Sequence, residues 1–392
     1  MAKSKKIGLD LIRVIAAFAV VVLHSGDDAL VPITRNAEIL RSYFVFPVPV
    51  FLALSFYLSS KSILEKEQFN LAKKLTKLLI PYFFFSAVYL FYDAIEITDL
   101  SLLPYLQRVF SPPMQDPIGI LLLGGAYVHL YFFPLLIVGT IALHYMGGWL
   151  KQQNTIQILG LAGASAFAHH WLRLSGNAFT IQGPNTAFKS LLPAIVDNPL
   201  LRILLTSGAL LIQCLPYMLI AFFIASKTSK LEQDVERPRD DLSSSRMQSG
   251  VKTIWSNRQK LIIGLMCLVL TILLLAFQST LFPDNRVLRD ITLAFLLLIF
   301  GLGISHKIDG ETFFAKAVVA ISQVSFGIYL LHHIYIGLFK KIEVFLPFYN
   351  PETITATRIF IFAVSSFVIS YITMTLLSQF IRHKRARQCL GL

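Results

Sequence analysis

The sequence has few charged residues and very few cysteines. Asp, Glu, Lys and Arg make up 15% of its 392 residues and 55% are hydrophobic, whereas a soluble globular protein is about 25% charged. This composition excludes a disordered chain, a coiled coil and an ordinary soluble enzyme. Two of the three cysteines lie in apolar runs and one in a basic tail, so no disulfide framework is expected. Unbroken apolar runs of about 20 residues instead predict an all-α polytopic membrane protein.

About ten apolar segments are long enough to cross a membrane. The apolar patch at 98–126 contains four prolines, and we interpret it as an interfacial or re-entrant segment. The polar, serine-rich segment 227–259 is expected to be a cytoplasmic connector loop between two helical halves of a single domain covering 1–392. The expected spans are 9–25, 43–60, 78–97, 127–146, 155–172, 199–226, 260–282, 287–305, 317–339 and 357–381.

Acidic residues are scarce relative to basic ones, with 22 against 35 and a net charge of +13. Most basic residues fall on one side of the expected spans, in segments such as 61–77, 227–260 and 382–387. The positive-inside rule then places both termini in the cytoplasm. We expect the protein to lie in the cytoplasmic (inner) membrane, with membrane lipids around it. Because topology explains the basic balance, no nucleic-acid partner is expected.

Two polar residues of the first span stand out against its apolar surroundings. Arg13 lies inside the span, where a charge costs about 2.5–3.5 kcal/mol near the centre; snorkelling to the surface or pairing with Asp10 is the alternative. His24 follows eleven residues later, and eleven steps of about 100° come to three turns plus about 20°. Arg13 and His24 therefore share one helix face, about 16 Å apart. The face carries a fixed cation at the cytoplasmic end and a titratable imidazole at the outer end.

Further candidate residues lie near the membrane surfaces. His129 opens the fourth span and His332 lies in the outer half of the ninth; each is either functional or a hydrogen-bonding residue between helices. The basic residues before the third span are either topology anchors or a rim that could grip phosphates; they are Lys73, Lys74 and Lys77. No phosphate-binding loop, nucleophile elbow or zinc-ligand spacing is present, so no metal is expected.

The segment Leu9 to Arg13, followed by His24 after ten residues, resembles the N-terminal signature of the membrane acyltransferase 3 family. Phe56 and Tyr131 depart from the usual Gly and Trp of the second and fourth helices. We expect a stand-alone form without the family's extracytoplasmic esterase-like domain. Four later segments resemble family segments in the same order: 48–59 (VPVFLALSFYLS), 73–85 (KKLTKLLIPYFFF), 128–138 (VHLYFFPLLIV) and 325–333 (SFGIYLLHH).

The resemblance implies an O-acyltransferase that moves an acyl group, usually acetyl, from cytosolic acyl-CoA such as acetyl-CoA to a hydroxyl of a cell-surface or lipid-linked carbohydrate. Arg13 and the three lysines would hold the donor's phosphates, and His24 would be the general base or carry the acyl group itself. A glycan or lipid-linked sugar exporter is the alternative, since a ten-helix bundle with an intramembrane charge fits that too. The stripe from Arg13 to His24, together with the basic rim, favours the enzyme.

Overall fold

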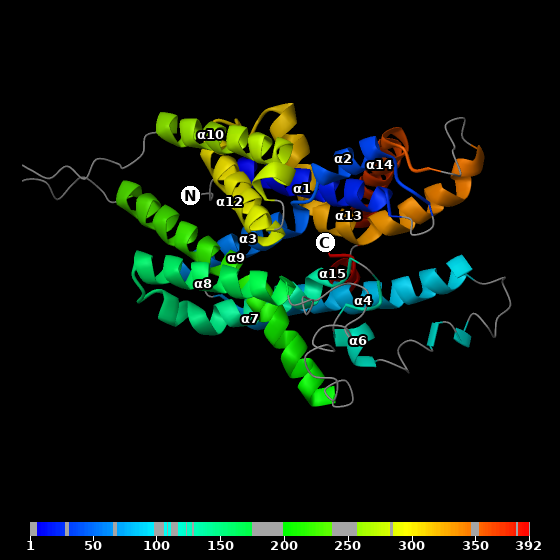
Figure 1. Cartoon of the computed structure of the whole chain (residues 1–392), viewed down its shortest axis with the longest axis horizontal. Helices are drawn as coiled ribbons and strands as arrows, with labels where there is room; N and C mark the ends of the chain where they lie inside the picture. Colours follow the sequence, from blue (N-terminus) through cyan, green and yellow to red (C-terminus); the bar gives the residue numbers. More distant parts are fainter. Residues whose placement is uncertain are drawn as a thin grey trace, which may run out of the picture.

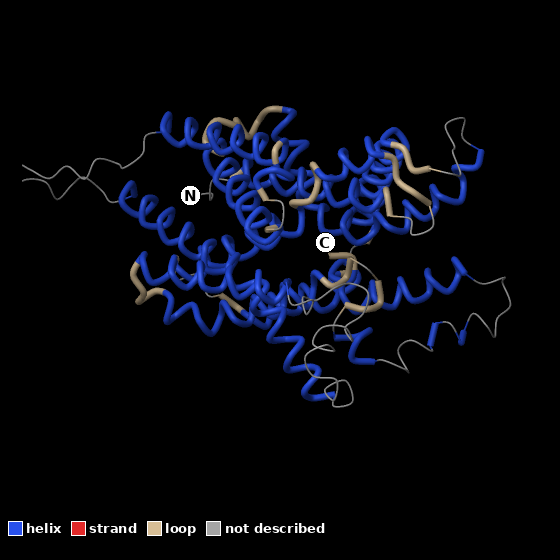
Figure 2. Tube along the Cα trace, in the orientation of Figure 1, coloured by secondary structure: helices blue, strands red, loops and turns tan. Residues whose placement is uncertain are grey.

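In the computed structural model, the regular secondary structure of the described part of the chain is helical, and one isolated bridge joins Ile33 and Ile354. Figures 1 and 2 show the helices. The long ones are α1 (Ile7–Ser25), α3 (Pro47–Leu64), α4 (Leu71–Ile97), α7 (Phe132–Leu150), α8 (Thr155–Leu174), α9 (Pro199–Glu236), α10 (Asn257–Ala276), α12 (Arg286–Ile304), α13 (Phe313–Ile342) and α14 (Ala356–Phe380). The short ones are α2 (Arg35–Ser42), α6 (Pro117–Leu122), α11 (Gln278–Leu281) and α15 (Lys384–Cys389). The structure describes residues 6–27, 31–65, 69–97, 106–107, 109–110, 117–122, 124–127, 129–174, 199–236, 257–282, 285–345, 353–381 and 383–391.

Within these ranges, nine helices are long and apolar enough to cross a membrane. They correspond to nine of the expected spans, so the prediction of an all-α polytopic membrane protein is confirmed. The expected span 155–172 forms helix α8, which is not among the nine. Composition alone therefore leaves the tenth crossing open.

Contacts at the helix ends show that α8 also crosses the bundle. Gly147 near the end of α7 faces Ile63 near the end of α3, and the hydroxyls of Tyr57 in α3 and Thr228 in α9 are 3.1 Å apart. Helices α7 and α9 thus run in the same direction and end at the same side of the bundle. The chain between them must return across it, and α8, which packs against α9, is the helix described there. Among the described residues, ten helices therefore run across the bundle, and nine of them have the length and hydropathy expected of a membrane span.

Several boundaries differ from the hydropathy-based expectation. Helix α9 continues to Glu236, so the first part of the expected connector 227–259 is helical, while 237–256 lies outside the described residues. The helical part of the expected connector, 227–236, is rich in Lys, Glu and Gln, which favour a helix without being apolar. Helix α7 begins at Phe132, five residues later than expected, and α4 begins at Leu71, seven residues earlier. Hydropathy marks the membrane crossing, whereas backbone hydrogen bonding sets the helix ends.

Most of the expected interfacial segment 98–126 lies outside the described residues. The described portion includes the short helix α6, which packs against α4. Its interfacial or re-entrant placement therefore remains a prediction.

Helix α1 packs against α3, α12, α13 and α14. Its contact with α12 is a backbone contact, because a Cβ on Gly8 would lie 2.0 Å from the carbonyl oxygen of Gly301. Small residues allow such close approach in membrane bundles. A second glycine compensates for the unusual Phe56: a Cβ on Gly139 would lie 2.3 Å from the Phe56 ring, so α3 and α7 pack around a large side chain here.

A buried ion pair fixes the end of α13 to the start of α14. Arg358 donates two hydrogen bonds to the carboxylate of Glu343, both 2.6 Å long. The side chains are only 6% and 7% exposed. A bidentate pair of this kind is geometrically specific. It holds the half of α13 that carries His332 and His333.

Candidate active site

A cavity of about 1160 Å³ lies at the side of the bundle where α1 and α4 begin. Its walls come from α1, α3, α4, α7, α13 and the C-terminal segment. No Asp or Glu is among the described residues that line it. An excess of positive charge in a partly apolar cavity favours a polyanionic ligand. The cations that line the cavity are Arg13, Lys73, Lys74, Lys77 and Arg387.

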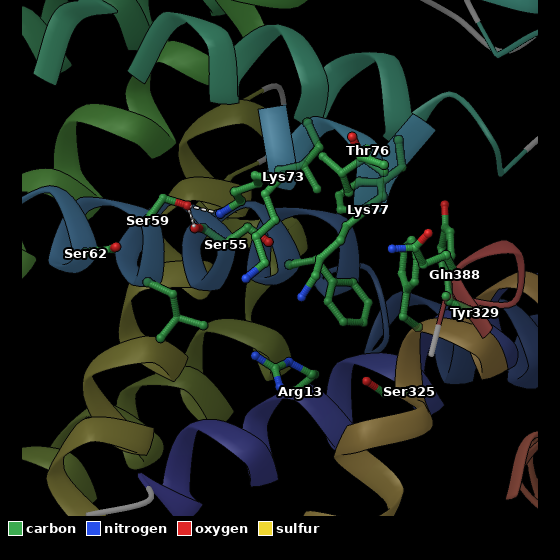
Figure 3. A pocket seen from close by; sticks show the side chains of 18 of the residues that line it. Arg13, Ser55, Ser59, Ser62, Lys73, Thr76, Lys77, Ser325, Tyr329 and Gln388 are labelled. Atoms are coloured by element: carbon green, nitrogen blue, oxygen red, sulfur yellow. Dashed lines mark hydrogen bonds between the residues drawn. The ribbon is translucent and has the colours of Figure 1, made fainter. Parts of the chain in front are cut away.

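Helix α4 presents the three lysines to this cavity. The side chain of Asn70 accepts a hydrogen bond of 2.8 Å from the backbone N–H of Lys73, in the manner of a helix N-cap. Lys73 and Lys77 are four residues apart and share a face; they reach into the cavity opposite Arg13 (Figure 3). Lys74 donates to the hydroxyl of Ser59 and ties α4 to α3. All three lie inside α4 rather than before it.

Asp10 and Ser322 hold the Arg13 side chain in place. Nη1 of Arg13 donates to Oδ1 of Asp10 at 3.3 Å and to the hydroxyl of Ser322 at 3.1 Å. That hydroxyl in turn donates to Asp10 at 2.6 Å. The pairing of Asp10 with Arg13 is thus present, and Arg13 still lines the cavity. Asp10 orients the guanidinium group across the contact between α1 and α13.

The C-terminal segment closes one side of the cavity. Helix α15 packs against α4, and Arg387, Gln388 and Gly391 line the wall. Gly391 has a φ of +73°, and a Cβ there would lie 2.4 Å from the ring of Phe326, so glycine is required at this contact. The basic tail was expected to act only in membrane topology. Its only signal for a binding role was the run of basic residues.

Four histidines from distant parts of the sequence meet at the other end of α1. The ring centroid of His24 lies 4.3 Å from that of His333, 5.3 Å from His332 and 6.5 Å from His129. The rings of His129 and His333 stack at 4.7 Å. Three of the four are buried, while the side chain of His24 is 16% exposed. The candidates His24, His129 and His332 therefore share one site, at the opposite end of α1 from the cationic cavity.

Asp27, which sequence analysis missed, orients His24. Its Oδ2 lies 2.6 Å from Nδ1 of His24, and its Oδ1 accepts a hydrogen bond from Arg41. Burial opposes ionisation of Asp27, but the hydrogen bonds and charges of His24 and Arg41 outweigh it and lower the pKa of this carboxyl. An ionised Asp27 accepts a hydrogen bond from Nδ1–H of His24, and this tautomer leaves the lone pair on Nε2. The one sequence signal was an acidic residue just past the helix end at Gly26.

The neighbouring histidines carry buried nitrogens that have no hydrogen-bond partner among the described residues. Both ring nitrogens of His129 and Nε2 of His332 and of His333 are in this state. A buried polar atom without a partner costs about 1–3 kcal/mol. Such atoms therefore indicate a place where a polar ligand group binds.

Tyr329 lies between the cavity and the histidines. It lines the cavity, and its ring is 5.4 Å from that of His129 and 6.0 Å from that of His332. Its hydroxyl donates to the backbone carbonyl of His129. The cationic cavity and the histidine cluster are thus adjacent along the face of α1 that bears Arg13 and His24.

The family model described as "Acyltransferase domain", Acyl_transf_3, matches residues 6–375, nearly the whole chain. The match includes all four histidines and every cavity cation except Arg387. Comparison with curated proteins and with solved structures found no match.

Proposed function

The chain belongs to the acyltransferase 3 family, and from this membership we propose that it moves an acyl group, most simply acetyl, from acyl-CoA to a hydroxyl of a surface or lipid-linked carbohydrate. The observation that carries the proposal is the pairing of a cationic cavity, which no described Asp or Glu lines, with a histidine cluster along one helix. An exporter of glycans needs no such pairing, so the enzyme is favoured over the alternative.

The donor fits the cavity by charge and shape. Coenzyme A carries its phosphates at one end of a long arm and its thioester at the other. Arg13, Lys73, Lys77 and Arg387 would meet the phosphates, since guanidinium and ammonium groups pair strongly with them. The arm would follow α1 past Tyr329 toward His24. The aromatic packing around the histidines favours a short acyl chain such as acetyl.

The acceptor hydroxyl would bind at His24. Nε2 takes the hydroxyl proton as the oxygen attacks the thioester carbonyl; the carbon–sulfur bond then breaks, and the protonated His24 returns the proton to the departing thiolate. Asp27 stabilises the imidazolium and fixes its orientation, as the acid does in a catalytic triad. An acyl-histidine intermediate is the other route. Trapping labelled protein after a pulse of radiolabelled acetyl-CoA distinguishes the two.

Detergent-purified protein tests the proposed function. We expect it to bind radiolabelled acetyl-CoA and to release free CoA thiol, with label passing to carbohydrate when a membrane glycan extract is added. Absence of both donor binding and CoA release would contradict the proposal.

Both ends of the described chain lie at the cavity side of the bundle, and we propose that this side faces the cytoplasm. In a cysteine-free background, Asn36→Cys should react with a membrane-impermeant maleimide in intact cells. Lys307→Cys should react only after permeabilisation. Both positions are exposed and near opposite ends of the bundle. The reverse pattern would invert the topology and move the donor cavity to the outside.

Replacing Lys73, Lys74 and Lys77 together by Gln should weaken acetyl-CoA binding by about tenfold or more, because charge-assisted contacts contribute about 1.5–3 kcal/mol each. The loss should be larger at low salt, where electrostatic attraction is least screened. Equilibrium binding in detergent measures it. The control is Lys151→Gln with Lys307→Gln, two exposed lysines outside the cavity wall. Equal affinity in both variants would reduce the three lysines to topology anchors.

Arg387→Gln alone should weaken acetyl-CoA binding by about three- to tenfold, because an exposed cation contributes less than a buried one. His383→Gln, an exposed change in the same tail, serves as the matched control. Dissociation constants from the same binding assay decide the matter. If Arg387→Gln binds acetyl-CoA as tightly as its control, the charge of Arg387 does not contribute to donor binding, although the tail still lines the cavity.

A further inference from the structure

Three imidazoles from two helices point a ring nitrogen at one small region. The ligand atoms offered by His24, His332 and His333 all lie within 4.8 Å of one another. Helices α1 and α13, which carry them, pack directly together. The spacing of these residues in the sequence gives no sign of a metal site, because its ligands come from opposite ends of the chain.

The surroundings of the first two histidines match those of metal ligands. A metal-bound histidine usually donates its other N–H to a carboxylate or a backbone carbonyl. Nδ1 of His24 lies 2.6 Å from Asp27, and Nδ1 of His332 lies 2.7 Å from the backbone carbonyl oxygen of Tyr329. Both partners leave Nε2 with its lone pair. Two histidines with two different partners are thus fixed in the same tautomer.

The receiving nitrogens are buried and unsatisfied. Nε2 of His332 and Nε2 of His333 have no hydrogen-bond partner among the described residues. The two residues are 0% and 7% exposed. Because these lone pairs are shielded from water, a cation that binds to them would satisfy both nitrogens. His24 is 16% exposed, and its partner Asp27 is 41% exposed, which leaves an entrance from the outer end.

We propose that Nε2 of His24, His332 and His333 bind one divalent transition-metal ion of the Zn²⁺ class, and that the bound ion reversibly inhibits acyl transfer. Neutral imidazoles suit Zn²⁺, Cu²⁺ and Ni²⁺, whereas Mg²⁺ and Ca²⁺ require oxygen ligands. Bonds of about 2.0–2.1 Å in a tetrahedral site require the nitrogens to approach to about 3.3 Å, which side-chain rotation can supply. The fourth position stays open toward the entrance.

The bound ion would inhibit acyl transfer because it occupies the lone pair on Nε2 of His24. A metal-bound Nε2 of His24 cannot accept the proton of an acceptor hydroxyl. The inhibitory consequence rests on the proposed function, but the metal site itself does not. Direct binding and inhibition are therefore measured separately.

Protein stripped with a chelator is titrated with Co²⁺, whose visible absorption reports nitrogen coordination, and with Zn²⁺ by calorimetry. We expect one site per chain in the wild type. His333→Asn should weaken binding by at least about 10²-fold, the upper range of losses seen for changes in metal surroundings. His332→Asn should do the same. The control His306→Asn changes an exposed histidine at the other end of the bundle and should bind like the wild type. Retained acetyl-CoA binding shows that each variant is folded.

To test inhibition, the Zn²⁺ concentration that halves the rate of acyl transfer is compared between the wild type and His333→Asn. It should rise at least about 10²-fold in His333→Asn relative to the wild type, whatever the basal rate. Wild-type binding no tighter than that of His333→Asn would overturn the site. Binding without inhibition would overturn the regulatory half of the proposal. A protein that binds Zn²⁺ but transfers no acyl group would contradict the proposed function and leave the metal site standing.

Discussion

Replacing His24 by Ala should lower acyl transfer by about 10²–10⁴-fold, the usual contribution of a general acid–base residue. Nε2 of His24 has the lone pair for this chemistry, because Nδ1 is occupied by Asp27. Acetyl-CoA binding should change little, since the cationic cavity surrounds Arg13 at the other end of α1. Single-turnover transfer with purified protein measures the rate, and equilibrium binding measures the donor.

His306→Ala is the matched control, because that histidine is exposed and far from the cluster. The His24 variant should also remain inserted and folded, since this side chain is a partly exposed residue near a helix end. Near-wild-type transfer by His24→Ala would reject the mechanism. His129 or His332 would then be the next candidate base, as both lie within 6.5 Å of His24 between ring centroids.

Asp27→Asn should lower the catalytic rate by about 10²-fold while leaving the affinity for acetyl-CoA close to that of the wild type. In a catalytic triad the same change costs about 10⁴-fold by favouring the wrong histidine tautomer; Asp27 is 41% exposed, so the expected loss is smaller. Glu38→Gln, an exposed change in α2 at the same end of the bundle, is the control. A rate like that of the control would show that Asp27 does not orient His24.

The same residue predicts a pH dependence of stability. The pKa of Asp27 is lowered in the folded protein, so its contribution is fully present above the unfolded value of about 3.9. That contribution is lost as the pH falls through the folded pKa. Thermal unfolding should therefore differ between wild type and Asp27→Asn at neutral pH, and the two should converge in strong acid. A difference that persists unchanged in strong acid would contradict this account.

Sequence periodicity predicted the polar stripe of α1 well, because a helix fixes the relative direction of residues by spacing alone. It also offered the pairing of Asp10 with Arg13 as one alternative, and that contact within one turn is present. It misplaced the ends of α4, α7 and α9, because hydropathy does not report where helical hydrogen bonding continues into polar sequence. It missed Asp27, which lies past the helix end, where spacing no longer fixes direction.

The all-α membrane bundle follows from the amino-acid sequence, since apolar segments in lipid must satisfy their backbone groups internally and only helices do so within one segment. The clustering of His129, His332 and His333 around His24, and the position of Arg387 beside the lysines of α4, became visible only in the folded chain. The helical architecture is a local consequence of composition and solvent. The assembly of the histidine cluster and of the cationic cavity depends on which helix faces meet, and packing among residues far apart in the chain settles that.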